Sequence, residues 1–231
     1  MQFRNSYDVV DIAVNKQWLD FEDKYGLRPD SITVQLLADG ELTDKEKTIQ
    51  PDQEGNWTCT FNDLPKYKDG VEIVYTVQEV VPDGYTSEIG EYDPILGGYT
   101  IVNSLEVGDV QVTKNLNKYN TTADGATFAF KVVGVYDGKE IYNNVFGLTF
   151  KGKDTQSFVV KDLPIGTVVT VTEEYSGSAY KVDGEDTVTV TVVKNSDTQE
   201  IVLAEFNNIY DDYRQGHGAI NRHKAGQEGY E

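Results

Sequence analysis

The stretch that decides the fold is Ile12-Ala13-Val14-Asn15-Lys16-Gln17-Trp18, which alternates apolar and polar residues as a β-strand does. Because successive side chains of a strand point to opposite faces, Lys16 shares the apolar face with Val14 and Trp18. Burying a lone charge costs several kcal/mol or forces a change of protonation state. A core-facing lysine therefore predicts polar partners elsewhere in the chain.

A second copy of this strand, Val110-Gln111-Val112-Thr113-Lys114, places Lys114 on its apolar face 98 residues later (114 − 16). In both halves, an apolar strand, an aromatic residue before Asp-Leu-Pro, a strand ending in Glu and a strand ending in Asn follow in the same order. The first copy comprises Ile32–Leu37, Phe61 with Asp63-Leu64-Pro65, Tyr75–Glu79 and Tyr99–Asn103. The second copy comprises Phe128–Val135, Phe158 with Asp162-Leu163-Pro164, Val169–Glu173 and Glu205–Asn208. Such a repeat predicts two copies of one domain.

Short strands separated by turn signals such as Asp39-Gly40 and Asp137-Gly138 run through the whole chain, and convincing helical periodicity is absent. We therefore expect an all-β protein with two tandem immunoglobulin-like β-sandwich domains. The predicted bounds are 1–105 and 106–211. The connection is too short for a flexible spacer, so the pair is expected to form a semi-rigid rod. The Gly-rich remainder, 212–231, is interpreted as a disordered or added tail.

The composition and charge of the chain narrow its functional class. The 231 residues carry a net charge of −19, and 39% are hydrophobic, which suits packed cores and predicts no nucleic-acid partner. No apolar run approaches a membrane span and no signal peptide is recognisable. We interpret the chain as a fragment of a longer protein, monomeric on its own. Cys59 is the only cysteine, so no internal disulfide is possible and a small core side chain is expected.

The strands that end in Glu and Asn also place these side chains on apolar faces. Glu79 shares a face with Val77. Glu173 is expected to face inward together with Tyr175, while Glu174 faces outward. Each half thus brings one Lys, one Glu and one Asn to inward positions of three strands: Lys16, Glu79 and Asn103, then Lys114, Glu173 and Asn208.

These motifs resemble a known family of domains. The first half resembles the collagen-adhesin B-type (Cna B) domain over residues 8–105, through Lys16-Gln17-Trp18, Trp57 with Phe61-Asn62-Asp63-Leu64-Pro65, Tyr75-Thr76-Val77-Gln78-Glu79 and Pro82-Asp83-Gly84-Tyr85. The second half resembles the related pilin-type domains of Gram-positive surface proteins, through Lys114, Asp162-Leu163-Pro164, Glu173 and Phe206-Asn207-Asn208-Ile209-Tyr210. The resemblance implies sandwiches of the Cna B, transthyretin-like type.

The resemblance also implies one intramolecular isopeptide bond in each half, with the inward Glu as the catalytic residue. The implied crosslinks are Lys16 to Asn103 and Lys114 to Asn208, with Glu79 and Glu173 as the catalytic residues. Asn207 is an open alternative to Asn208, because a shift of the strand by one residue would exchange the two.

The chemistry of such a bond can be argued from burial. Burial disfavours the charged lysine and leaves a neutral amine that can attack. Burial likewise favours a protonated Glu carboxyl, which can hydrogen-bond the Asn carbonyl and relay protons as ammonia leaves. Folding holds the groups at high effective molarity. Each site would react once, so we expect self-crosslinking rather than an enzyme, and no cofactor.

We expect the chain to be a structural stalk or spacer of a Gram-positive cell-surface adhesin or pilus protein. It would be extracellular and attached to the cell wall through other parts of the parent protein, whose other domains are its expected partners. The alternative is an adhesive module that binds a host matrix protein or glycan through exposed tyrosines such as Tyr67, Tyr92 and Tyr142. A hydrolase is disfavoured, because His217 and His223, the two histidines, lie in the tail.

A metal site is not predicted either. The acidic stretch Asp20-Phe21-Glu22-Asp23 offers oxygen ligands for calcium, but it lacks the EF-hand pattern. We interpret it as solvated charge.

Overall fold

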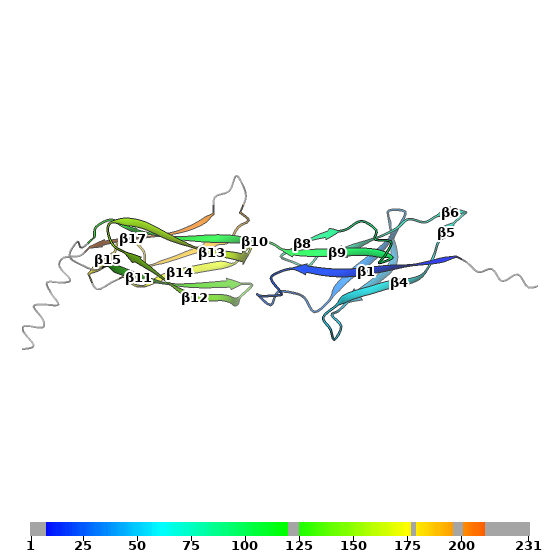
Figure 1. The fold of residues 1–231 in the computed structure, drawn as a ribbon, viewed down its shortest axis with the longest axis horizontal. Helices are drawn as coiled ribbons and strands as arrows, with labels where there is room; N and C mark the ends of the chain where they lie inside the picture. Colours follow the sequence, from blue (N-terminus) through cyan, green and yellow to red (C-terminus); the bar gives the residue numbers. More distant parts are fainter. Residues whose placement is uncertain (1–7, 120–124, 177–178, 196–200, 211–231) are drawn as a thin grey trace, which may run out of the picture. The chain divides into compact units, whose positions relative to one another are not determined.

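The computed structural model describes residues 8–119, 125–176, 179–195 and 201–210. His217, His223 and the predicted tail lie outside these ranges. The chain divides into two compact units, residues 1–106 and 107–231. Both units are built from strands and turns in the described residues (Figure 1). Within the same ranges, no helix is long and apolar enough to cross a membrane.

The first unit contains two sheets, with strand orders β4-β1-β9-β8 and β3-β2-β7, and a small hairpin, β5-β6. The strands of the first sheet are β1 (Val9–Leu19), β4 (Trp57–Pro65), β8 (Tyr85–Ile89) and β9 (Gly98–Leu105). Those of the second sheet are β2 (Ile32–Ala38), β3 (Glu41–Ile49) and β7 (Tyr75–Val80). The hairpin is formed by β5 (Tyr67–Lys68) and β6 (Val71–Glu72).

The two sheets of the first unit pack their apolar faces against one another. Val14 of β1, Leu36 of β2 and Ile101 of β9 are at most 1% exposed and belong to one core cluster. The alternation read from the sequence places these residues inward, and burying each aliphatic side chain contributes roughly 1.5–3 kcal/mol. The unit is therefore a β-sandwich.

The second unit repeats this architecture with sheets ordered β13-β10-β17-β15 and β12-β11-β14-β16. Its first sheet contains β10 (Val107–Leu116), β13 (Asp154–Pro164), β15 (Tyr180–Val182) and β17 (Val202–Tyr210). Its second sheet contains β11 (Ala126–Tyr136), β12 (Lys139–Phe150), β14 (Val168–Tyr175) and β16 (Thr187–Thr191). The predicted fold class, all-β with two tandem sandwiches, is confirmed.

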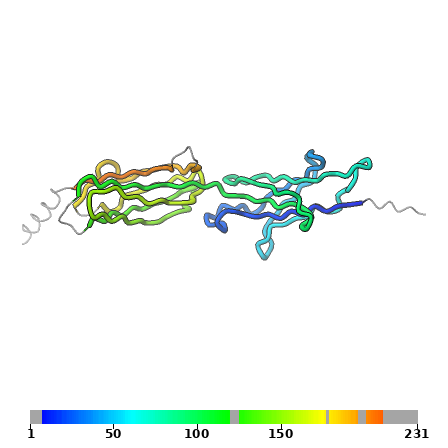
Figure 2. The backbone as a smooth tube through the Cα atoms, turned by 45° about the horizontal axis from the view of Figure 1, so that its top comes forward, coloured from blue at the N-terminus to red at the C-terminus, as the bar shows by residue number. Residues whose placement is uncertain are grey.

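In each unit, the first and last strands lie side by side and run parallel. The β1 strand pairs with β9, and β10 pairs with β17 (Figures 1 and 2). All other pairings in the two sandwiches are antiparallel. Because the terminal strands are parallel, the chain enters each sandwich at one end and leaves it at the other.

The repeated Asp-Leu-Pro motif is explained by a β-bulge. Asp63 of β4 and Asp162 of β13 adopt left-handed backbone angles, with φ of 55° and 59°. The register of each strand against its neighbour shifts at this place. The Asp63 amide donates a hydrogen bond of 2.8 Å to the carboxylate of Asp11, and the Asp162 amide donates one of 3.0 Å to Asp109. The same bulge therefore recurs in both units, each time with an aspartate carboxylate as the hydrogen-bond acceptor.

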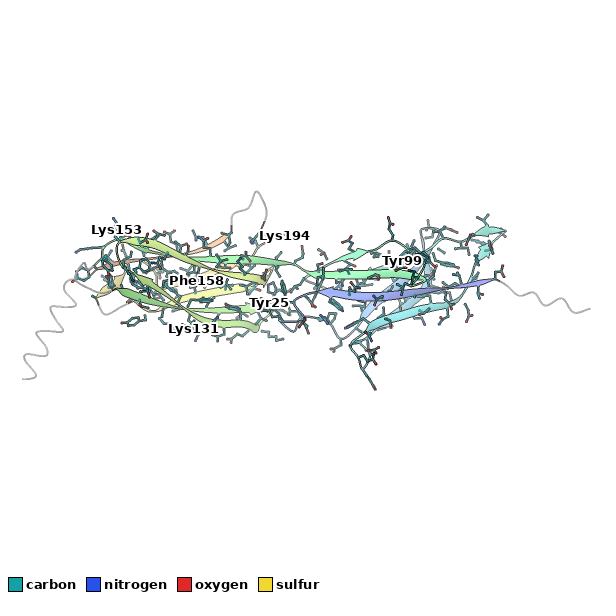
Figure 3. The ribbon with its side chains drawn as sticks, in the orientation of Figure 1. Tyr25, Tyr99, Lys131, Lys153, Phe158 and Lys194 are labelled. Carbon is teal, nitrogen blue, oxygen red and sulfur yellow. The ribbon has the colours of Figure 1, made fainter. Side chains whose placement is uncertain are left out.

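The register of β13 corrects one expectation from the sequence. Phe158, labelled in Figure 3, pairs with Val112 and is not the counterpart of Phe61, whose place is taken by Val160. The bulge lets Val160 and Leu163 both face inward, a spacing that simple alternation does not anticipate.

Tyr175 was expected to face the core with Glu173, but it is 53% exposed. Against β11, Glu173 pairs with Phe130 and Tyr175 pairs with Ala129, so Glu174 is the extra residue of a bulge. The bulge reverses the alternation after Glu173, which explains the error.

Candidate functional site

The first candidate site joins side chains from both sheets of the first unit. Lys16 lies on β1, Asn103 on β9 and Glu79 on the facing strand β7. In the parallel pairing, Lys16 stands opposite Ile101, so Asn103 lies two residues further along on the same face. Lys16 is 4% exposed and Asn103 is fully buried, and the side chains of Lys16 and Glu79 are both 0% exposed. The three predicted residues therefore meet inside the sandwich.

The Glu79 carboxylate is the centre of this site. Its Oε1 accepts a hydrogen bond of 3.0 Å from Asn103 Nδ2 and lies 3.8 Å from Lys16 Nζ. Lys16 Nζ donates instead to the main-chain oxygen of Gln17, at 3.1 Å, and lies 4.4 Å from the ring centroid of Trp18. The amine is thus close to the carboxylate without being hydrogen-bonded to it.

Burial lowers the pKa of Lys16 to about 8, although the charges of Glu79 and Asp20 oppose the shift. At neutral pH, about a tenth of the amine is therefore uncharged. A neutral amine carries the lone pair that nucleophilic attack requires.

The second candidate site repeats the arrangement with closer contacts. Lys114 pairs with Phe206, so Asn208 again lies two residues further along the parallel neighbour. Glu173 Oε2 accepts from Lys114 Nζ at 2.7 Å, and Glu173 Oε1 accepts from Asn208 Nδ2 at 2.6 Å. Lys114 is 0% exposed, and burial lowers its pKa, although the hydrogen bond and charge of Glu173 oppose the shift.

Asn207 lies on the other face of β17 from this site. Its Oδ1 accepts a hydrogen bond of 3.2 Å from Asn115 Nδ2. Asn208 is completely buried beside Glu173. The register of β17 therefore brings Asn208 to the lysine and the glutamate, and keeps Asn207 away from them.

The orientation of both asparagine amides differs from the expectation. Each Nδ2 faces the glutamate, while the Oδ1 atoms of Asn103 and Asn208 are buried and find no partner among the described residues. An ionised carboxylate only accepts hydrogen bonds, so it selects the NH₂ group and turns the carbonyl away. The geometry thus presents the nitrogen that would leave as ammonia to the glutamate, rather than the carbonyl oxygen.

Sequence reasoning missed Ser87 of β8. Its hydroxyl donates a hydrogen bond of 2.7 Å to Glu79 Oε2. It reaches the site because Ser87 is paired with Asn103 across the β8–β9 ladder. In the second unit, the residue paired with Asn208 is Val182 of β15, which has no hydroxyl. No local pattern marks Ser87, since the contact depends on the pairing of two strands.

The interpretation of the acidic stretch after β1 as solvated charge is wrong for Asp20. Asp20 is not solvated but 1% exposed, and its two carboxylate oxygens accept from Nε and Nη2 of Arg28 at 2.9 and 2.6 Å. Burial alone would raise the pKa of Asp20, but the hydrogen bonds from Arg28 and the Asp23 amide hold it below its usual range. Among the described residues, no group of three or more His, Cys, Asp or Glu could hold a metal ion.

The remaining side chains singled out from the sequence are three tyrosines and Cys59. Tyr67 and Tyr92 are 45% and 46% exposed, and Tyr142 is half-buried. The ring of Tyr92 packs edge-on against Tyr99. Cys59 packs against the first core, and burial raises the pKa of its thiol to about 11, so it is a structural side chain and not a nucleophile.

Comparison with known proteins agrees with the resemblance seen in the motifs. Residues 12–104 match the family described as Cna protein B-type domain, and residues 110–211 match a domain of unknown function, DUF5979. A collagen adhesin of Staphylococcus aureus is 32% identical over 214 residues. That match covers 89% of this chain and 17% of the adhesin, so the chain spans a small part of this relative.

Solved structures of surface proteins are also similar. Two B repeat units of the collagen-binding protein of Staphylococcus aureus match with 21% identity and a TM-score of 0.43, over 87% of this chain and 49% of that one. A major pilin of Streptococcus pyogenes matches with 14% identity and a TM-score of 0.43, over 87% of this chain and 97% of the pilin. Residues 12–104 thus match the Cna protein B-type family, and residues 110–211 match a family without an assigned function.

Proposed function

We propose that this chain is a structural stalk or spacer segment of a Gram-positive surface adhesin or pilus protein, in which each domain closes its own Lys–Asn isopeptide bond. The observation that carries the proposal is the repeated site. In both units, a fully buried lysine side chain and a buried asparagine lie on parallel terminal strands, and one buried glutamate contacts the asparagine. Burying a lysine, a glutamate and an asparagine together in both units has no evident structural purpose, because apolar residues of similar size would stabilise each core at least equally.

The reaction that suits this geometry is a transamidation. The lysine first releases its proton to the surroundings, which leaves a neutral amine beside the glutamate carboxylate. The amine nitrogen attacks Cγ of the asparagine, and the C–Nδ2 bond breaks as the new C–Nζ bond forms. The glutamate takes a proton from the attacking nitrogen and gives it to the departing nitrogen, so the products are an amide, ammonia and the unchanged glutamate carboxylate. The contact of Nδ2 with Glu79 and Glu173 supports this relay.

The topology gives such a bond a mechanical purpose. Tension would enter the first unit along β1 and leave along the parallel strand β9. A bond between Lys16 and Asn103 would carry the force directly from one strand to the other, so residues 17–102 would bear none of it. A bond between Lys114 and Asn208 would protect the second unit in the same way. An inextensible spacer of this kind suits an extracellular protein anchored through its other domains.

Intact mass spectrometry of the denatured full chain tests the proposal. We expect a mass lower than the sequence sum by two ammonia molecules, and fragment spectra that join Lys16 to Asn103 and Lys114 to Asn208. Glu79→Gln and Glu173→Gln keep the shape of the side chain but remove the relay, so each should restore one ammonia mass. An unmodified mass for the wild-type chain would refute the proposal.

The alternative function, an adhesive module for a host matrix protein or glycan, stays a prediction. Tyr67 and Tyr92 of the first unit are exposed and available for contact, and a relative is a collagen adhesin. Binding of the purified chain to immobilised collagen, compared with a Tyr67→Ala/Tyr92→Ala double variant, would detect this function.

A further inference from the structure

The two candidate sites use the oxygens of their glutamates differently. In the first unit, the Ser87 hydroxyl donates a hydrogen bond of 2.7 Å to Glu79 Oε2, and the Lys16 amine lies 3.8 Å from Oε1. In the second unit, the corresponding oxygen of Glu173 accepts from the Lys114 amine at 2.7 Å. The difference coincides with the residue paired with the reactive asparagine, which is Ser87 in one unit and Val182 in the other.

We propose that Ser87 is a positioning residue for crosslinking in the first domain, because its hydroxyl holds Glu79 Oε2 and keeps the carboxylate from pairing closely with the Lys16 amine. The inference rests on the crosslinking reaction proposed above. It assigns Ser87 no contact with the reacting atoms and no share in proton transfer. Its effect passes through Glu79.

The chemical consequence follows from what the amine must do. A lysine held at 2.7 Å by a carboxylate is stabilised as an ammonium ion and has no lone pair for attack. A lysine at 3.8 Å from the carboxylate, bonded to a main-chain oxygen, loses much of that stabilisation. Ser87 thus favours the uncharged, reactive amine in the first site, whereas Val182 leaves the second lysine tightly paired.

The charged groups around Lys16 are few, so the effect of Ser87 can be isolated. Glu79 approaches from β7, and Asp20 and Arg28 act from the segment that follows β1. Asp20 and Arg28 neutralise each other in a bidentate pair. Burial has the largest effect on the charge of the amine, and Glu79 is the charged group whose position affects it most.

The test compares Ser87→Val with Ser87→Thr, which have nearly the same shape and differ in the hydroxyl. Both are made in the full chain with Lys114→Met, so that one ammonia loss reports the first domain alone. Chains from a short cell-free translation pulse are moved to buffers of different pH and weighed intact at timed intervals. We expect the Ser87→Thr chain to crosslink within about twofold of the rate with Ser87, and the Ser87→Val chain about tenfold more slowly. The rise of the Ser87→Val rate with pH should also lie about one pH unit higher, because one unit of amine pKa changes the neutral fraction tenfold.

Equal rates and equal pH profiles for Ser87→Val and Ser87→Thr would overturn the inference while leaving the crosslink itself intact. Absence of ammonia loss with Ser87 in place would overturn the crosslink and the inference together. The reciprocal change, Val182→Thr in a Lys16→Met chain, keeps the inference falsifiable if Ser87→Val does not fold. We expect it to speed crosslinking of the second domain about tenfold, and no acceleration would overturn the role of the hydroxyl.

Discussion

Replacing Lys16 with Met removes the nucleophile of the first domain and keeps a flexible side chain of similar length in the core. The bond to Asn103 would close a loop of 87 residues (103 − 16). By analogy with a disulfide, closing a loop of this length lowers the entropy of the unfolded chain by an amount worth about 4.6 kcal/mol at 25 °C. We therefore expect Lys16→Met to lower the free energy of unfolding of the first domain by about 4.6 kcal/mol.

Tryptophan fluorescence measures this domain alone, because both tryptophans, Trp18 and Trp57, lie in its sandwich, with ring centroids 5.2 Å apart. With a urea dependence of about 1.5 kcal/mol per M for a domain of this size, the midpoint should fall by about 3 M. Glu79→Gln is the matched control: it keeps Lys16 but cannot relay the proton, so its midpoint should fall by a similar amount. If the wild-type chain has lost ammonia and yet unfolds at the same urea concentration as Lys16→Met, the loop-closure argument is refuted.

Three further predictions concern the second site, the amine and the buried ion pair. Asn208→Ala should abolish the ammonia loss of the second domain while Asn207→Ala leaves it unchanged, and the opposite result by intact mass would contradict the register of β17. The rate of crosslinking in the first domain should rise about tenfold per pH unit below pH 8 and level off above it, because the pKa of Lys16 is about 8; a flat profile in newly synthesised chains would contradict this. Asp20→Asn should destabilise the first domain by about 3 kcal/mol in urea, since Arg28 loses its buried partner. Folding lowers the pKa of Asp20, so the stabilisation by this ion pair in the wild-type chain should disappear as the pH falls through that pKa. A free energy of unfolding that does not change at low pH would contradict this expectation.

Much of the candidate site could be predicted from single strands. The inward positions of Lys16, Glu79 and Asn103 follow from the two-residue period of a strand, which is a local property of the backbone. The same reasoning failed at Tyr175, because a bulge added one residue after Glu173 and reversed the alternation. A bulge depends on the neighbouring strand, so the period of one strand does not reveal it.

The sequence by itself determined the fold class, the repeat and the residue types that face each core, because hydrophobic alternation and turn residues act over a few positions. Only the tertiary structure decided which strands are neighbours. The parallel pairing of β1 with β9 sets Lys16 beside Asn103, and that of β10 with β17 selects Asn208 over Asn207. The contact of Ser87 with Glu79 likewise arises between strands from opposite sheets. These contacts join residues far apart in the chain, and their geometry is set by the packing of two sheets around a common core.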